Sequence, residues 1–182
     1  MTTRYVALLR GINVGGNNLI KMSALKECLE QLGMQNVSTY IASGNVLFDS
    51  PKNQSEAKQA KALETGLSKQ FGYEARLTLR SPKEMEALVK KAPKGFGKHP
   101  EQYRYDCIFL FEPLTANEAL PLVPQKEGVD QLWAGDRVLY SARLIAKVTA
   151  SRLNRIVGTK VYQSMTIRNW NTSSKLAALL AK

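Results

Sequence analysis

The chain has 182 residues, and 26 Lys and Arg residues against 15 Asp and Glu residues give it a formal net charge of +11. With 44% hydrophobic and 23% charged residues, its composition is that of a globular protein, which excludes a disordered tail or a collagen-like repeat. No apolar run approaches the roughly 20 residues that a membrane helix needs. The N-terminus has no charged-then-apolar leader with a cleavage site, so we expect no secretion signal and a cytoplasmic protein.

The cysteine and histidine content argues against a disulfide framework and against a metal site. The two cysteines, Cys28 and Cys107, lie in apolar contexts, which is typical of a reducing compartment. The single histidine, His99, lies in a Pro- and Gly-rich stretch with no set of further zinc ligands. The sequence therefore predicts no metal and no cofactor, and it identifies no catalytic residue.

The excess positive charge is concentrated near the C-terminus. Residues 1–136 hold 17 basic and 15 acidic residues, whereas residues 137–182 hold nine basic residues and no acidic one. A stretch of one sign attracts anions and raises their local concentration. The candidate partners are nucleic acid, a phosphorylated small molecule or an acidic protein, and a basic surface that only aids solubility is the alternative.

The first half of the sequence predicts alternating strands and helices. Residues 4–10 are apolar at nearly every step, which indicates a strand covered on both faces. A Gly- and Asn-rich loop over 11–18 leads to a helix over 23–32, for which Ser23 is the expected N-cap. The further elements, in chain order, are strands over 37–42 and 45–49 joined by a tight turn, a helix over 55–71 and a strand over 73–80. This β-α-β-β-α-β order is that of the ferredoxin-like unit.

The second half repeats this order. A capping box at Ser81 and Glu84 opens another helix, and a Pro- and Gly-rich stretch around 92–102 marks the boundary between the halves. The expected elements are strands over 105–111, 129–133, 138–142 and 161–167, and helices opening at 115–118 and spanning 151–157 and 172–180. We therefore predict an α+β protein of two ferredoxin-like halves with antiparallel sheets plus a C-terminal helix, with domains over 1–92 and 103–182.

The loop after the first strand is a candidate anion site. Its glycines let backbone N–H groups converge, and a following helix N-terminus adds partial positive charge. The spacing of Gly11 and Gly16 is that of a phosphate loop, but Asn17 and Asn18 stand where that loop needs a lysine and a hydroxyl residue. The motif of a nucleoside triphosphatase is therefore missing. The alternative is a plain connector whose Gly and Asn residues tolerate left-handed backbone.

Arginine, asparagine and hydroxyl residues also cluster near the C-terminus. Arg168 can hold a phosphate or carboxylate through two N–H groups, and Thr172 is the expected N-cap of the last helix. Nucleic-acid contact through Arg168 and Trp170 is one interpretation; core packing of Trp170 with a capping role for Asn169 is the other. A sheet that stacks bases is disfavoured, because the strand at 45–48 lacks the aromatic pattern of RNA-binding sheets.

Four segments carry a recognisable pattern: residues 5–19 (YVALLRGINVGGNNL), 22–32, 36–48 (NVSTYIASGNVLF) and 166–176 (TIRNWNTSSKL). They resemble an uncharacterised, largely bacterial family, domain of unknown function 1697. The resemblance spans nearly the whole chain, although residues 142–148 match only loosely. It implies an α+β fold with two ferredoxin-like halves and no established activity. The residues that it carries over are Arg10, Gly11, Asn13, Gly15, Gly16, Asn17, Ser43, Gly44, Asn45, Arg168, Asn169 and Trp170.

The resulting hypothesis is a binding protein for an anionic, phosphate-bearing ligand, either nucleic acid or a nucleotide. The alternatives are a small enzyme acting on an anionic metabolite and a structural or interaction module without a ligand. We expect no membrane partner, and the sequence leaves the oligomeric state open. We expect the candidate ligand-binding residues to converge in one cationic recess. They are Arg10, Gly11, Asn13, Gly15, Gly16, Asn17, Asn18, Lys21, Ser43, Asn45, Arg168 and Asn169.

Overall fold

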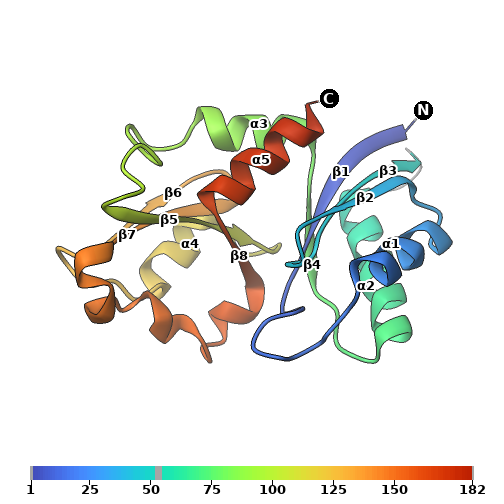
Figure 1. The fold of residues 1–182 in the computed structure, drawn as a ribbon, viewed down its shortest axis with the longest axis horizontal. Coiled ribbons are helices and arrows are strands. Elements are labelled where there is room, and N and C mark those ends of the chain that lie inside the picture. Colours follow the sequence, from blue (N-terminus) through green and yellow to red (C-terminus); the bar gives the residue numbers. More distant parts are fainter. Residues whose placement is uncertain (1, 52–54, 182) are drawn as a thin grey trace. The chain divides into compact units, whose positions relative to one another are not determined.

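The computed structural model describes residues 2–51 and 55–181 and contains two four-stranded antiparallel sheets (Figure 1). The chain divides into two compact units, Met1–Met85 with Ala178–Lys182, called the first unit, and Glu86–Ala177, called the second unit. None of the helices in the described ranges combines the length and the apolar character that crossing a bilayer requires.

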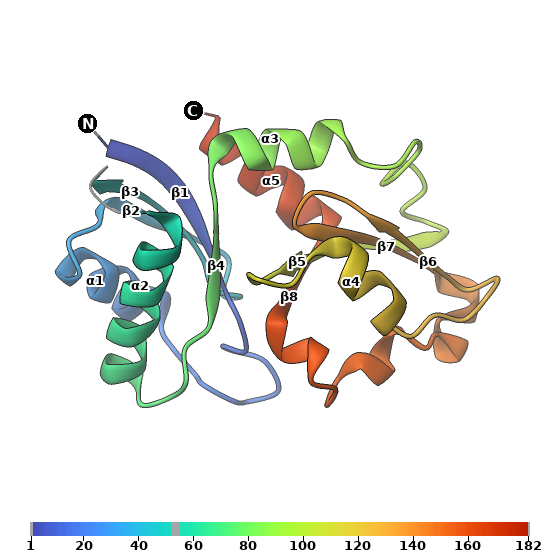
Figure 2. The ribbon, with the colours of Figure 1, turned by 180° about the vertical axis from the view of Figure 1, so that it is seen from behind.

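The first unit has the strand order β2-β3-β1-β4, which is the ferredoxin-like order predicted for the first half. Both of its helices lie on the same face of the sheet (Figures 1 and 2), where Leu25 and Leu29 of the first helix join Leu63 and Leu67 of the second in the core. The elements are β1 (Thr2–Leu9), α1 (Met22–Gln31), β2 (Gln35–Tyr40), β3 (Asn45–Pro51), α2 (Glu56–Phe71) and β4 (Leu77–Arg80).

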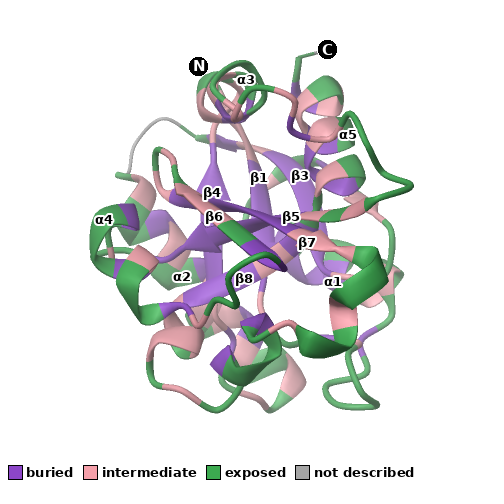
Figure 3. Cartoon of the chain, turned by 90° about the vertical axis from the view of Figure 1, so that its left-hand side faces the viewer, coloured by how far each residue is buried: buried purple, intermediate pink, exposed green. Residues whose placement is uncertain are grey.

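The second unit repeats the topology with the strand order β6-β7-β5-β8. Its core packs Ile108, Leu139 and Met165 of the sheet against the short helix α4. Val6–Leu9 of β1 and Cys107–Leu110 of β5 are buried, and Figure 3 shows both strands largely in the buried colour, which confirms the prediction that these apolar strands are covered on both faces. The elements are β5 (Tyr103–Leu110), α4 (Ala116–Ala119), β6 (Asp130–Ala134), β7 (Val138–Leu144) and β8 (Met165–Asn169), and the remaining helices of the chain are α3 (Pro82–Lys90) and α5 (Trp170–Leu180).

The connection from β7 to β8, residues 145–164, is called the crossover below, and it differs from the prediction. Three short 3₁₀ segments, Ile145–Ala150, Leu153–Ile156 and Val161–Ser164, replace the helix expected over 151–157, and β8 begins only at Met165. The reason is a tertiary contact: Asp130 accepts hydrogen bonds from the Ser151 hydroxyl (2.6 Å) and the Arg152 N–H (2.9 Å). These bonds hold the backbone at Ser151 and Arg152 in a turn against β6, between two short 3₁₀ segments.

Two helix starts also differ from the prediction. α1 begins at Met22 with Lys21 as its N-cap residue and without a side-chain cap, so the capping role expected for Ser23 is wrong. The Asn169 side chain accepts a hydrogen bond from the Thr172 N–H (2.7 Å), so Asn169 and not Thr172 caps α5. The capping box predicted at Ser81 and Glu84 is confirmed by their reciprocal bonds, and Thr115 and Glu118 form a second capping box at the start of α4.

Candidate functional site

The loop at residues 10–21, called the Gly/Asn loop, and the turn between β2 and β3 lie side by side at one end of the first unit. The Leu9 N–H donates to the Gly44 carbonyl (2.9 Å). A Cβ on Gly44 would lie 2.8 Å from Cδ1 of the buried Ile12, so only glycine fits at this contact. The structure therefore brings together the ten candidate residues of the first unit, which come from these two segments.

Asn13 is the residue that joins the loop to the turn. Its amide nitrogen donates to the carbonyls of Ile20 (2.9 Å) and Ala42 (2.8 Å), and its amide oxygen accepts from the Ile20 N–H (2.8 Å). Asn18 closes the same loop by donating to the Gly11 carbonyl (2.8 Å). Both side chains thus bind the protein's own backbone.

Asn45 plays the same part inside the turn. It is fully buried, and its amide nitrogen donates to the Tyr40 carbonyl (2.9 Å) and to the Ser43 hydroxyl (3.0 Å). A buried amide with these partners fixes the hairpin geometry. The side chains of Ser43 and Asn45 are therefore part of the turn itself.

The rest of the Gly/Asn loop is accessible. Gly15 and Gly16 are exposed at φ 59° and 79°, and the Asn17 N–H donates to the Val14 carbonyl (3.1 Å) in a tight turn. The Asn17 side chain makes no hydrogen bond with any other described residue. Lys21 is exposed, whereas Arg10 is half-buried and engaged within the protein, so this part of the loop has an exposed cation beside open backbone.

Arg168 belongs to the second unit and is almost completely buried. Its guanidinium donates to the Thr166 hydroxyl and to the Ile167 carbonyl, both at 2.9 Å. Burial lowers the pKa of Arg168 to about 10, so the side chain stays charged at neutral pH. Asn169 caps α5, and Trp170 packs edge-on against Phe96 with ring centroids 5.1 Å apart. Convergence of Arg168 and Asn169 with the residues of the first unit stays a prediction.

A second buried arginine, Arg80, repeats the arrangement of Arg168 and was not among the candidates. Its guanidinium also donates to the hydroxyl of the threonine two positions before it, Thr78, and to the carbonyl of the residue between them. Each arginine lies on the last strand of its unit, at a register position opposite the unit's first strand. The Thr-x-Arg pattern at 78–80 and 166–168 is the sequence signal that could have found it.

The crossover presents four exposed cations, Lys147, Arg152, Arg155 and Lys160. Within residues 2–51 and 55–181 none of the four forms an ion pair. Asp130, a carboxylate that contacts the crossover, is buried and accepts its hydrogen bonds from backbone N–H groups and a hydroxyl. The four side-chain charges of the crossover are therefore not neutralised within the described part of the chain.

The sheet of the second unit carries an aromatic groove of about 150 Å³ that the sequence reasoning missed. Its rings are Phe96, Tyr103, Tyr105 and Trp133. The strand at 45–48 carries one ring, the fully buried Phe48, whereas β5 and β6 of the second sheet carry the rings of Tyr103, Tyr105 and Trp133. The premise of the argument against a stacking sheet, the lack of an aromatic pattern, therefore holds for the strand at 45–48 and not for the second sheet. The available signal was the spacing of Tyr103 and Tyr105, which places both rings on one face of a strand.

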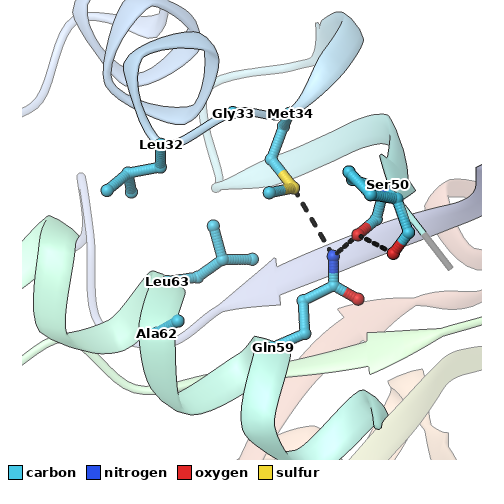
Figure 4. Close-up of a pocket in the computed structure, with 8 residues that line it drawn as sticks. Leu32, Gly33, Met34, Ser50, Gln59, Ala62 and Leu63 are labelled. Atoms are coloured by element: carbon cyan, nitrogen blue, oxygen red, sulfur yellow. Dashed lines mark hydrogen bonds between the residues drawn. The ribbon is translucent and has the colours of Figure 1, made fainter. Parts of the chain in front are cut away.

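A second cavity, of about 180 Å³, lies in the first unit beside α2 (Figure 4). Its walls are largely apolar, with Leu32 and Leu63 among them, and its buried amide, Gln59, is hydrogen-bonded to Ser50 and to the sulfur of Met34. These polar groups are engaged with one another, so this cavity is a gap in packing.

The cysteines and acidic residues do not form a reactive cluster in the part of the chain that the structure describes. No three His, Cys, Asp or Glu side chains there gather closely enough to hold a metal ion. Burial raises the pKa of Cys28 and raises that of Cys107 to about 12. Both groups are therefore neutral thiols at physiological pH, which are poor nucleophiles.

The model of the family described as "Protein of unknown function (DUF1697)" matches residues 1–140. The chain belongs to this family. The structure of the conserved bacterial protein SP0830 from Streptococcus pneumoniae is similar, with a TM-score of 0.86, 27% sequence identity and coverage of 100% of both chains. That likeness extends beyond the DUF1697 match to residues 141–182, which include the crossover and β8. No curated protein matches the chain.

Proposed function

We propose that this DUF1697 protein binds a phosphate-bearing ligand, nucleic acid or a nucleotide, and that the crossover of the second unit is its main contact surface. The observation that carries the proposal is the set of four exposed cations that no described carboxylate neutralises. Two of them, Arg152 and Arg155, have the planar guanidinium that holds phosphate oxygens through paired N–H groups.

The charge of the surrounding unit supports the same partner class. Residues 86–177 hold 14 basic and 8 acidic residues, a net charge of +6. One of the basic residues near the crossover, Arg143, is already paired with Asp106 at 2.6 Å and is not counted among the contact residues. A net positive unit attracts a polyanion before any specific contact forms.

A second role is favoured for the Gly/Asn loop by a specific observation. The side chains of Asn13, Asn18 and Asn45 all bond within the loop and the turn. These motif residues serve the fold of the first unit, while the exposed Lys21 and the open backbone at Gly15 and Gly16 form a secondary contact for the ligand.

The experiment is a salt titration of binding to a fluorescein-labelled DNA duplex, followed by anisotropy. We expect the affinity to fall steeply with salt, because each neutralised phosphate releases a counterion and contributes about −0.9 to the slope of log K against log salt. The double variant Arg152→Gln with Arg155→Gln should make that slope shallower by about 2.

The matched control is Lys58→Gln with Lys61→Gln, which removes two exposed cations from α2 in the first unit. This variant has the same change of net charge but leaves the crossover intact. An affinity indifferent to salt would contradict phosphate binding, and an equal loss in both double variants would contradict the crossover as its site.

A further inference from the structure

We propose that the aromatic groove of the second unit stacks a base of single-stranded nucleic acid. The inference deepens the proposed function and rests on it, since it names the form of polyanion that the second unit prefers. The groove is the place where planar rings, an amide and a cation meet on the surface of a rigid sheet. Aromatic platforms beside a basic surface are how proteins hold unpaired bases.

The strand register builds the floor of the groove. Ala142 on β7 lies between Tyr105 on β5 and Gln131 on β6, as the register partner of both. Because alanine is small, this row leaves a depression between two larger neighbours. Tyr103 lies two positions before Tyr105 and Trp133 lies two positions after Gln131, so both project from the same face as this row. The depression is therefore walled by rings from two different strands.

Phe96 fixes the orientation of these rings from one end of the groove. It is 9% exposed and meets Tyr105 edge-on, with centroids 4.8 Å apart, and Trp133 at 6.1 Å with perpendicular planes. Its other side is held by Tyr140 (5.3 Å) and Trp170 (5.1 Å). Rings held in this way lose little conformational entropy when a ligand stacks on them.

The size of the groove fits one base ring. Its volume is about 150 Å³, and a cavity of about that volume in another protein holds a benzene molecule. Tyr103, Tyr105 and Trp133 are half-buried, so part of each ring surface is open to a ligand. The exposed amide of Gln131 can both donate to and accept from the edge of a base.

The charge around the groove selects an anionic ligand. Lys94 lines it, no carboxylate does, and the same connecting segment carries the exposed Lys91 and Lys98. In the described part of the chain these three lysines form no ion pair. A duplex keeps its bases stacked inside and cannot offer one to the groove, whereas a single strand offers both a base and its flanking phosphates.

The test uses tryptophan fluorescence of the full chain. The chain has two tryptophans, and Trp170→Phe leaves Trp133 in the groove as the reporter. We titrate this variant with a single-stranded oligothymidylate of about 12 nucleotides, with a DNA duplex of the same length and with inorganic polyphosphate. The expected result is quenching of Trp133 by the single strand alone, together with tighter binding than either other polyanion.

A substitution arm separates the groove from the general charge. Trp133→Leu should weaken single-strand binding by about tenfold or more, the effect of losing one stacked base, and leave polyphosphate binding unchanged. Tyr103→Leu, at the more exposed end of β5, is the second variant in case Trp133→Leu does not fold. Tyr5→Leu, which replaces a half-buried strand tyrosine of the first unit, is the matched control and should bind the single strand as the unaltered chain does.

Two results would overturn the inference. One contradicts only base stacking in the groove, and the other also contradicts the proposed function. Equal quenching and affinity for the single strand, the duplex and polyphosphate would discard the groove and leave the proposed phosphate binding standing. No salt-dependent binding of any of the three would discard the proposed function and the groove together.

Discussion

In the Gly/Asn loop, a single asparagine side chain supplies hydrogen bonds that backbone groups supply in a regular sheet. A loop that leaves a sheet has N–H and C=O groups without strand partners, and buried groups of this kind must be paired. Asn13 supplies one acceptor and two donors to Ile20 and Ala42. The Asn13 side chain thereby supplies to two segments the hydrogen bonds that a neighbouring strand supplies within a sheet.

We expect Asn13→Ala to lower the free energy of unfolding by about 2 kcal/mol, because three hydrogen bonds are lost at a half-buried position. Urea denaturation measures the change. Asn17→Ala is the control, since the Asn17 side chain has no such partners among the described residues, and its stability should stay close to that of the unaltered chain. Similar losses in both variants would contradict the role of Asn13.

Alanine substitutions at Gly97 and Gly95 distinguish the cost of backbone strain from the cost of overlap with a neighbouring side chain. Both have positive φ, 79° and 82°, but a Cβ would overlap the Trp170 indole only at Gly97 and would meet nothing at Gly95. Gly95→Ala should therefore cost about 1 kcal/mol from strain alone, and Gly97→Ala about 1–3 kcal/mol more. Thermal unfolding followed by circular dichroism compares them, and equal losses would show that the indole yields freely.

The roles of these single residues were only partly predictable. The motif located Asn13, Asn45 and Arg168 as special, but an asparagine has the same donors and acceptor whether it binds a ligand or its own backbone. Their partners, Ala42 for Asn13 and Tyr40 for Asn45, are set by the tertiary fold. For the same reason the sequence favoured Thr172 as the cap of α5, although Asn169 performs that role.

At the scale of elements, the crossover depends on one carboxylate. Asp130 accepts hydrogen bonds from the N–H groups of Lys126 (2.8 Å) and Arg152 (2.9 Å) and from the Ser151 hydroxyl (2.6 Å). The short 3₁₀ segments on either side of Ser151 have no long hydrogen-bond ladder of their own. Asp130 is thus a polar anchor of the crossover to the sheet, beside the buried Leu153 and Ile156.

We expect Asp130→Ala to cost about 3 kcal/mol, because three donors lose a charged acceptor. Hydrogen exchange followed by mass spectrometry should show faster exchange across the crossover, with little change in β5. Asp136→Ala, in the exposed β6–β7 turn, is the control. Unaltered exchange in the Asp130 variant would contradict the anchoring role.

The elements that the sequence predicted best are those with a regular apolar pattern. Continuous apolar runs gave β1 and β5, and helical spacing gave α1 and α2, each to within a few residues. The crossover was missed because its conformation comes from the contact of Ser151 and Arg152 with Asp130, which is 21 and 22 residues away in sequence. Local propensity cannot report such a distant partner.

At the scale of the whole molecule, buried thiol and phenol groups make the free energy of unfolding fall at alkaline pH. Burial raises the pKa of Cys107 to about 12, from 9.0, and also raises the pKa of Tyr140 and of Tyr73 to about 12. Between about pH 9 and about pH 12 the unfolded chain has therefore lost a thiol proton that the folded chain keeps. Stability must fall as the pH rises through this range.

For Cys107 the expected slope is about 1.4 kcal/mol per pH unit above about pH 9. Urea denaturation at a series of pH values measures it. Cys107→Ala should be less stable at neutral pH, because it leaves a small cavity, yet show a shallower loss in alkali. A free energy of unfolding that stays constant up to about pH 11 would contradict the buried thiol.

The tight turns of the crossover also have a consequence for limited proteolysis of the native protein. The lysines and arginines of the crossover are the residues after which trypsin cuts, and a segment with few ladder bonds opens locally at low cost. Brief digestion should nick the chain first between Lys147 and Lys160, leaving two fragments that report the cut. A polyanion seated on these cations should slow that nick in proportion to its occupancy, so the protease can act as a footprinting reagent without any label on the ligand.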